Sequence, residues 1–213
     1  MGTHSAGLLP DRTALSQPRA DVFAPPGRQL PVRRTPLAGG RSPGWFFVAA
    51  HGGAGTTLLS RLSWQASSDG DDGGWRSSGA GAPPAYGMDS GRGWPNPALE
   101  PTGRVVVVCQ TTMRGLGWAR DAAAQHLSGS TPQGLELLGL VTIADQPGRL
   151  PHPIRAARDL LAGAYPRTWH LPYVDAYRLH GGLPDEPPPP LHPAVGEVLA
   201  AIRSLLLPKG TSA

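Results

Sequence analysis

The sequence predicts an α/β fold, a small three-layer domain in which helices cover both faces of a parallel sheet. Two observations predict it. Two short runs of residues, 45–50 and 105–109, are continuously apolar instead of alternating, and a third, 135–144, is largely apolar, which is typical of strands buried on both faces. A fourth run, 168–171, is short. Helical patterns lie between and after these runs, as parallel connections require. A length of 213 residues fits one domain.

The predicted strands are residues 45–50, 105–109, 135–144 and 168–171. A helix is expected to begin near Leu58, after the glycine-rich loop that follows the first strand. Leu116, Ala119, Ala123 and Leu127 have helical spacing and predict a second helix. Two further helices are predicted over 154–161 and 195–206, each preceded by a proline that suits a first helical turn.

The predicted domain spans residues 44–207 and is flanked by segments of low complexity. Glycine and proline together make up about a quarter of the chain. Residues 1–43 are expected to form a disordered basic tail, and residues 208–213 a short C-terminal tail. A long Gly/Pro-rich insert, residues 65–103, is expected to be flexible because it carries too little apolar surface to order itself.

Charge and cysteine content exclude several classes of function. The net charge is +4, and the first 43 residues account for it with six arginines against two aspartates. A basic tail with the possibility of nucleic-acid contact is therefore expected, and not a basic domain. The single cysteine, Cys109, excludes an internal disulfide and is expected to be a core residue. With no apolar run of about 18–20 residues and no signal-peptide pattern, a soluble cytoplasmic protein without membrane contact is expected.

The motif with a chemical mechanism is the glycine-rich loop after the first strand. It reads His51, Gly52, Gly53, Ala54, Gly55, Thr56 and Thr57. A glycine turn between a strand and a helix N-terminus directs bare N–H groups at one point and predicts an anion-binding cradle. Thr57 stands where a P-loop has its magnesium-binding hydroxyl, while Thr56 stands where it has lysine. The only lysine in the chain is Lys209.

The loop resembles the deviant Walker A motif of MinD/ParA-type ATPases, Gly-Lys-Gly-Gly-x-Gly-Lys-Thr, with His51 and Thr56 at its two lysine positions. Residues 138–150 and 169–175 are similar to the last two strands of that family, and the loop is also similar to that of an actinobacterial family with a His-Gly-Gly-x-Gly sequence. The resemblance implies a P-loop NTPase-like fold, with ATP and Mg²⁺ as ligands. It also implies that Asp145 and Pro172 lie on the base side. In that family a strand ending in Asp follows the first helix, whereas in this chain the stretch 65–103, which is expected to be flexible, occupies that interval.

No catalytic residue is assigned, and Thr57 is the one metal ligand expected. Without its lysine the loop is expected to hydrolyse ATP poorly, because phosphoryl transfer depends almost entirely on electrostatic stabilisation. The leading hypothesis is a pseudo-ATPase that binds nucleotide and acts as a scaffold. The resemblance implies a role beside DNA-transfer or partition machinery, with protein partners from that machinery, and it implies a homodimer. Two alternatives stay open: a weakly active ATPase using an arginine (Arg61, Arg114 or Arg149) or a partner residue, and an interaction module with an empty loop.

Three of these residues have a second interpretation. One interpretation of His51 is that it bridges a phosphate or a partner subunit. The other is that it is a partly buried histidine at a strand end whose ring nitrogens are hydrogen-bonded within the protein. Thr57 binds magnesium or caps the helix. Asp145 is a functional carboxylate or a turn residue.

Overall fold

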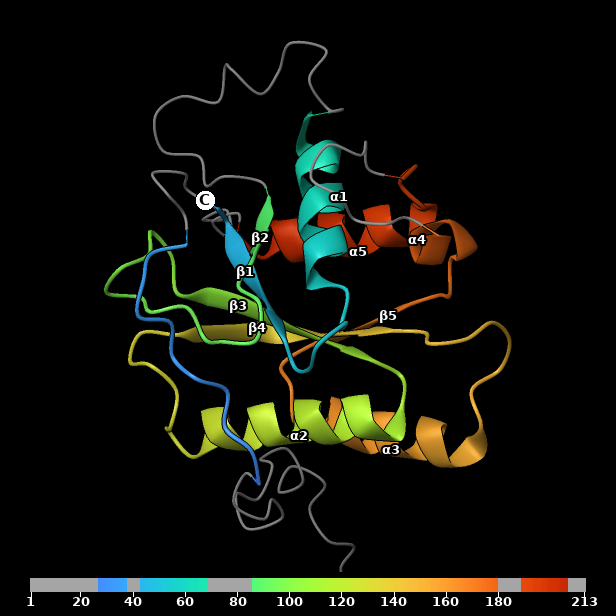
Figure 1. Ribbon diagram of the computed structural model, residues 1–213, viewed down its shortest axis with the longest axis horizontal. Coiled ribbons are helices and arrows are strands. Elements are labelled where there is room, and N and C mark those ends of the chain that lie inside the picture. The colour runs from blue at the N-terminus through green and yellow to red at the C-terminus, as the bar shows by residue number, and fades with distance from the viewer. Residues whose placement is uncertain (1–26, 38–42, 69–85, 180–188, 207–213) are drawn as a thin grey trace, which may run out of the picture.

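The computed structural model describes residues 27–37, 43–68, 86–179 and 189–206. They form a single five-stranded parallel sheet in the order β2-β1-β3-β4-β5 (Figure 1). The strands are β1 (Trp45–Ala49), β2 (Gly87–Asp89), β3 (Arg104–Gln110), β4 (Glu136–Ile143) and β5 (Thr168–Leu171). The helices are α1 (Thr56–Ser68), α2 (Met113–Leu127), α3 (His152–Ala162), α4 (Asp175–Leu179) and α5 (Pro193–Ser204).

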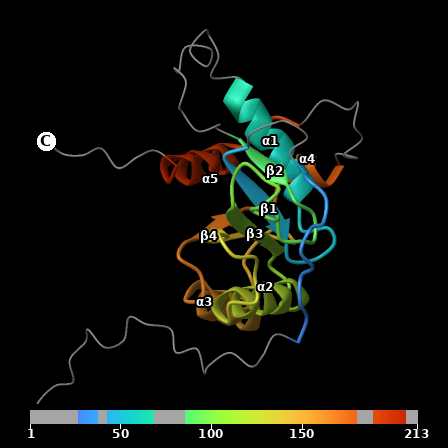
Figure 2. The same cartoon turned by 90° about the vertical axis from the view of Figure 1, so that its left-hand side faces the viewer.

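The helices cover the sheet on both faces, which confirms the predicted α/β class. Helices α1, α4 and α5 lie on one side of the sheet and α2 and α3 on the other, as both views show (Figures 1 and 2). The chain moves from β1 outward to β2 and then returns past β1 to β3. The strand order therefore reverses at β1, where the α1 connection and the α2 connection lie on opposite faces.

Two apolar cores lie on the two faces of the sheet, and the strands supply both. Phe46 and Val48 of β1 face the α2 side, while Trp45 and Phe47 face the α1 side. The valines of β3 alternate in the same way, and all four are fully buried. Burial on both faces is the physical reason why the strands read as continuous apolar runs.

The strand β2 lies inside the segment that was predicted to be a flexible insert. Residues 86–103 are ordered and packed, so the prediction for 65–103 is wrong over that part, while residues 69–85 lie outside the described residues. The strand has only three residues, too short for an apolar pattern to reveal it. The side chains of α1 hold it in place. Ser63 Oγ accepts from Gly87 N at 2.8 Å, and Ser60 Oγ accepts from Asp89 N at 3.2 Å.

Part of the predicted tail also packs on the domain. Leu30 is buried, and its backbone N–H and carbonyl pair with the Gln125 side chain at 2.9 and 3.0 Å. Pro31 and Arg33 exchange backbone hydrogen bonds with Trp94, a fully buried residue of the supposed insert. The tail prediction is therefore wrong for residues 27–37, because two segments of low complexity bury each other's few apolar side chains. Residues 1–26, 38–42 and 207–213, including Lys209, lie outside the described residues.

Cys109 is the core residue that the sequence predicted. It is fully buried in β3, and burial raises the pKa of its thiol to about 12, so the thiol is inert. None of the helices in the described ranges is long and apolar enough to cross a membrane.

Candidate functional site

The candidate site lies at the edge of the sheet where the parallel strands end. In open parallel α/β sheets, ligands bind beyond the carboxyl ends of the strands, at the point where the strand order reverses. Here that point is the end of β1, which leads directly into the glycine loop. The fold thus places the predicted loop at the position where such a sheet offers a crevice.

The backbone of the loop has the conformation for which its glycines were expected. Gly53 and Gly55 have φ angles of +75° and +95°, a region that other residues rarely adopt. A side chain at Gly55 would also lie 2.8 Å from the Ile143 Cδ1 atom at the end of β4. Helix α1 starts immediately afterwards, with Leu59 N donating to Gly55 O at 3.0 Å. At Gly53 and Gly55 the loop therefore presents bare backbone, next to the N-terminus of α1.

Thr57 and Asp89 form the central polar contact of the site. The Thr57 Oγ1 hydroxyl donates to Asp89 Oδ2 at 2.6 Å. Asp89 Oδ1 accepts from Gly91 N at 2.7 Å, which fixes the carboxylate at the end of β2. The Thr57 hydroxyl therefore bonds to the Asp89 side chain of β2 and does not cap α1. Asp89 ends the strand that follows α1, in a stretch where a flexible insert and no strand was expected.

His51 has a structural position with both ring nitrogens engaged. Gln110 N–H donates to His51 Nε2 at 3.1 Å, so Nδ1 carries the proton and donates to Gly52 O at 2.8 Å. The ring is mostly buried and links the end of β1 to the end of β3. This geometry matches the interpretation of His51 as a satisfied, partly buried histidine.

The packing around His51 predicts opposite effects for two glycines of α2. A Cβ at Gly115 would lie 2.4 Å from Gln110 O and 2.9 Å from His51 Nε2, whereas a Cβ at Gly117 has open space around it. We expect Gly115→Ala to destabilise the protein by about 1–3 kcal/mol through overpacking. Gly117→Ala should stabilise it by about 0.5–1 kcal/mol, because alanine favours the helix. Urea unfolding of both variants checks this, and equal effects would contradict the described contact.

Asp145 is not a free carboxylate. Its Oδ1 atom pairs with Arg178 Nη2 at 2.7 Å, and its backbone carbonyl accepts from the same Arg178 nitrogen. Asp145 N donates to Thr111 Oγ1 at 3.3 Å, so the turn after β4 is tied to both β3 and α4. Asp145 thus positions Arg178, a residue that sequence reasoning missed because nothing in the sequence shows that α4 returns to this edge.

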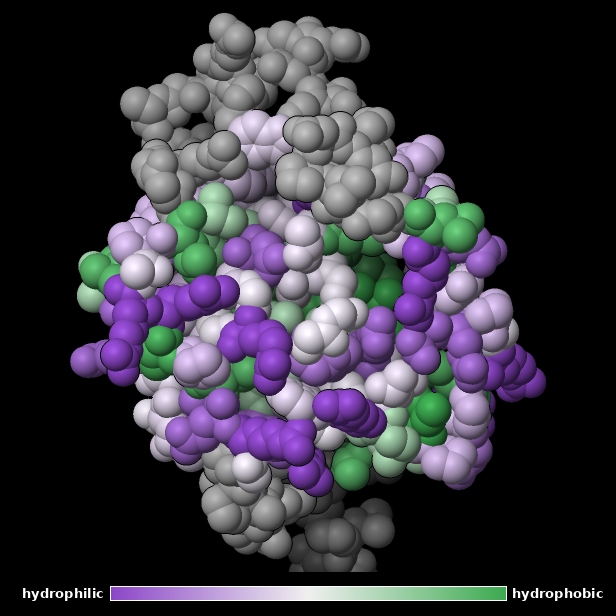
Figure 3. Space-filling model, viewed as in Figure 1, coloured by the Kyte–Doolittle hydropathy of each residue, from purple (hydrophilic) through white to green (hydrophobic). Residues whose placement is uncertain are grey.

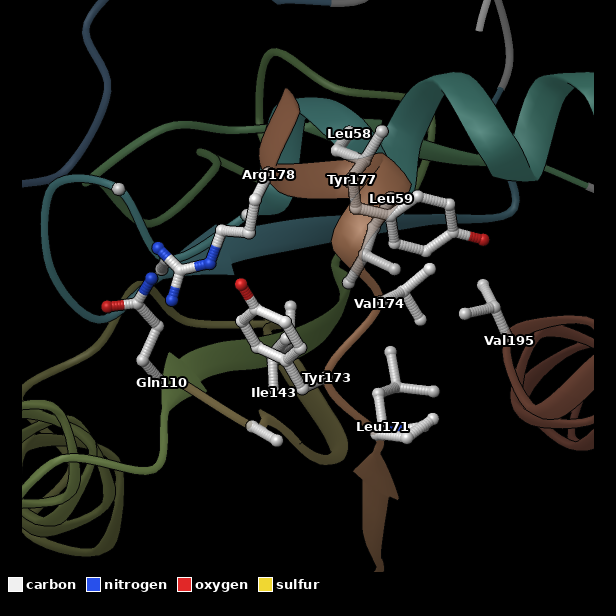
Figure 4. Close-up of a pocket in the computed structure, with 15 residues that line it drawn as sticks. Leu58, Leu59, Gln110, Ile143, Leu171, Tyr173, Val174, Tyr177, Arg178 and Val195 are labelled. Carbon is white, nitrogen blue, oxygen red and sulfur yellow. The ribbon is translucent and has the colours of Figure 1, made fainter. Parts of the chain in front are cut away.

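Two cavities flank the glycine loop. The first, about 180 Å³, is lined by Gly53–Gly55 and by the segment after β5, including Pro172, Tyr173 and Arg178. Figure 4 shows the Arg178 guanidinium and the Tyr173 hydroxyl facing the Gln110 side of this cavity, with Leu171, Val174 and Val195 on the other side. The second, about 250 Å³, is lined by the loop together with Thr56, Thr57 and Arg61.

The predicted loop residues and Pro172 border three cavities. Gly53, Ala54 and Gly55 border both cavities described above, Pro172 borders the first, and Thr56 and Thr57 border the second. His51 and Gly52 border a third cavity on the far side of the loop, together with Arg114. Within the described part of the chain, no three His, Cys, Asp or Glu side chains gather to form a metal site by themselves.

Fold and loop define the class: a parallel α/β protein with a glycine-rich loop after its first strand. The chain belongs to a family of unknown function, DUF6668, whose model matches residues 76–192. The match begins after the glycine loop and includes Asp89, Asp145 and Pro172. No curated protein and no solved structure matches the chain.

Proposed function

We propose that this protein binds a nucleoside triphosphate, with its phosphates on the loop 51–57 and with Mg²⁺, and works as a nucleotide-dependent scaffold. The observation that carries the proposal is the 2.6 Å contact between Thr57 Oγ1 and Asp89 Oδ2 beside the loop. A hydroxyl and a carboxylate at the mouth of an anion cradle are the pair of oxygen ligands that a phosphate-bound magnesium ion needs.

The loop supports phosphate binding through its backbone. Positive φ angles at Gly53 and Gly55 give the tight backbone turn that leads directly into the N-terminus of α1. Such turns before a helix N-terminus are common anion-binding sites. The positive end of a 13-residue helix favours an anion there. A Cβ atom added at Gly52 or Gly53 would meet nothing within 4 Å, so a ligand has room to approach the backbone closely.

Magnesium fits this site only together with the phosphates. Thr57 and Asp89 supply two hard oxygen atoms, and Mg²⁺ prefers six, completed by water and phosphate oxygens. When bound, the ion neutralises phosphate charge. The protein's own part is to hold the Asp89 carboxylate, through Gly91 N, at the distance where it accepts from Thr57.

The cavity under Pro172 supports binding of the base and sugar. Its walls are largely apolar, with Leu171, Val174 and Val195 on one side. Tyr173 and Tyr177 add aromatic rings with polar tips. Ligand pockets commonly combine an apolar lining with a few fixed polar groups, which here are the Arg178 guanidinium and the Tyr173 hydroxyl.

Because the loop lacks the P-loop lysine, a scaffold that binds ATP is favoured over an enzyme that hydrolyses ATP efficiently. No described residue of the loop carries a cation, and a lysine on the β- and γ-phosphates is part of P-loop catalysis. One observation favours the alternative of a weak ATPase: Arg178 lines the cavity next to the loop. A role beside DNA-transfer or partition machinery is supported by the resemblance of the loop alone.

The test is titration of the full-length protein with a fluorescent ATP analogue, with and without Mg²⁺. We expect saturable binding that requires Mg²⁺ and that unlabelled ATP displaces. Thr57→Ala should bind the nucleotide weakly whether or not Mg²⁺ is present, while Ser204→Ala, at the far end of α5, should keep the magnesium-dependent binding. No binding at millimolar nucleotide would overturn the proposal in favour of an empty loop.

Phosphate release from the same samples separates the two nucleotide-binding functions. A scaffold releases no phosphate above background. A weak ATPase releases it slowly, and the rate falls in both Thr57→Ala and Arg178→Gln.

A further inference from the structure

We propose that three arginines gathered on the ring of Trp118 form a second phosphate-binding site, separate from the glycine loop. Arg28, Arg92 and Arg114 have their guanidinium carbons 4.6, 4.9 and 5.9 Å from the centre of that ring. They come from three distant parts of the chain: the packed segment 27–37, the loop after β2, and the first turn of α2. The fold alone brings them together.

The cluster is a concentration of positive charge. Within the described residues, none of the three arginines has an ion pair with a carboxylate. The first turn of α2 holds no acidic residue and instead carries Arg114. A cation at the positive end of a 15-residue helix is unfavourable, as are like charges close together. The indole ring offsets part of this cost through cation–π contacts, and a bound anion would offset the rest.

A cavity of about 320 Å³ opens beside the cluster. Its lining is mainly polar and includes Arg92, Arg114 and Trp118 together with His51, Gln110 and Thr112. The Thr112 hydroxyl already accepts from Gly115 N, and its carbonyl from Leu116 N. This arrangement leaves the N–H groups of Met113 and Arg114 without an acceptor among the described residues. Figure 3 shows hydrophilic side chains gathered on the face where the segment 27–37 and the loops after β1 and β2 meet α2.

The chemistry of the cluster selects phosphate among anions. Guanidinium groups present paired N–H donors that match phosphate oxygens, and one phosphate has enough oxygens to accept from several arginines and a helix N-terminus at once. The arginines lie over the Trp118 ring, so the ring serves to position them. Recognition therefore rests on phosphate groups, whether they belong to a free polyphosphate or to the backbone of a nucleic acid.

This site does not depend on nucleotide binding in the glycine loop. The cavity at Trp118 shares Gln110 and no charged residue with the first loop cavity, and it shares no lining residue with the second. Thr57 and Asp89 do not line it. Failure of one proposal therefore leaves the other open, and the two are separated by variants at different residues.

The experiment uses the full-length protein in the Thr57→Ala background, and has two arms that distinguish the sources of phosphate. In the first, pyrophosphate is titrated by calorimetry at low salt. In the second, a fluorescein-labelled oligodeoxynucleotide is titrated by anisotropy over a series of salt concentrations. Each arm compares the parent with the double variant Arg92→Gln/Arg114→Gln, and with a control pair of equal charge change, Arg104→Gln/Arg155→Gln, remote from Trp118.

We expect the Trp118-site variant to lose about tenfold or more in affinity for the phosphate ligand, and the control to lose much less. If nucleic acid is the source, the slope of log affinity against log salt should fall by about 1 for each arginine removed. Binding of pyrophosphate with no such oligonucleotide binding identifies a small ligand. No binding in either arm, or equal losses in the two double variants, overturns the proposal. Trp118→Phe is a second variant that keeps an aromatic ring and therefore the fold, and it should bind the phosphate ligand with intermediate affinity.

Discussion

Replacing Asp89 with asparagine should lower the affinity for Mg²⁺-ATP by about 10- to 100-fold, the usual cost of losing a group that supports a metal site. Asparagine can keep both contacts at the end of β2, with its Oδ1 accepting from Gly91 N and its Nδ2 donating to Thr57 Oγ1. What is lost is the negative charge that faces the metal. The variant should therefore fold normally and fail only in the magnesium-dependent part of binding.

The same variant gives a signature that a general loss of structure would not produce. Without Mg²⁺, Asp89→Asn should bind ATP as well as the parent or better, because a carboxylate beside the phosphates is repulsive when no metal lies between them. Titration of a fluorescent ATP analogue at fixed Mg²⁺ and in EDTA measures both values. Asp159→Asn, an exposed partner of Arg158 on α3, is the matched control. A parallel loss of affinity with and without Mg²⁺ would argue against a metal at this position.

Replacing Trp94 with alanine should destabilise the protein by about 3–5 kcal/mol, the range for removing a fully buried large aromatic side chain. Trp94 has 0% exposure and packs in the same core as Leu30, Phe46 and Val105. Its backbone also pairs with Pro31 and Arg33, so the cavity would loosen the segment 27–37 as well. For a domain of this size we expect the melting temperature to fall by about 6–20 °C.

Thermal unfolding followed by circular dichroism checks the Trp94 prediction. Leu160→Ala is the control, since Leu160 is 80% exposed and its loss should change stability by no more than about 0.5 kcal/mol. Trp94→Phe should recover a large part of the stability because it refills most of the cavity. A Trp94→Ala protein as stable as the parent would mean that residues 86–103 do not contribute to the core.

The two proposed phosphate sites lie at the same edge of the sheet, on either side of the glycine loop. His51 and Gly52 border the Trp118 cavity, while Gly53, Ala54 and Gly55 border the two loop cavities. A phosphate bound on one side is thus separated from the other side only by the backbone of this loop. The two proposals are independent in their residues and adjacent in space.

The loop and the main strands were predictable because their signals are local. Continuous or largely apolar runs predicted β1, β3 and β4 nearly to the residue, and the short segment 168–171 matches β5. Glycines between a strand and a helix predicted the turn that Gly53 and Gly55 make. The pairing of Asp89 with Thr57 was not predictable in this way. A three-residue edge strand has no period, and its place is fixed by Ser60 and Ser63 of α1 and by β1.

By itself the sequence determined the α/β class, the parallel strands, the glycine loop and the absence of a lysine within it, because each depends on residue type and short-range spacing. Only the tertiary structure decided which distant groups meet: Asp89 with Thr57, Arg178 with Asp145, and three arginines on Trp118. It also decided that residues 27–37 and 86–103 are part of the domain. Those outcomes depend on mutual burial between segments that carry too few apolar residues to order themselves alone.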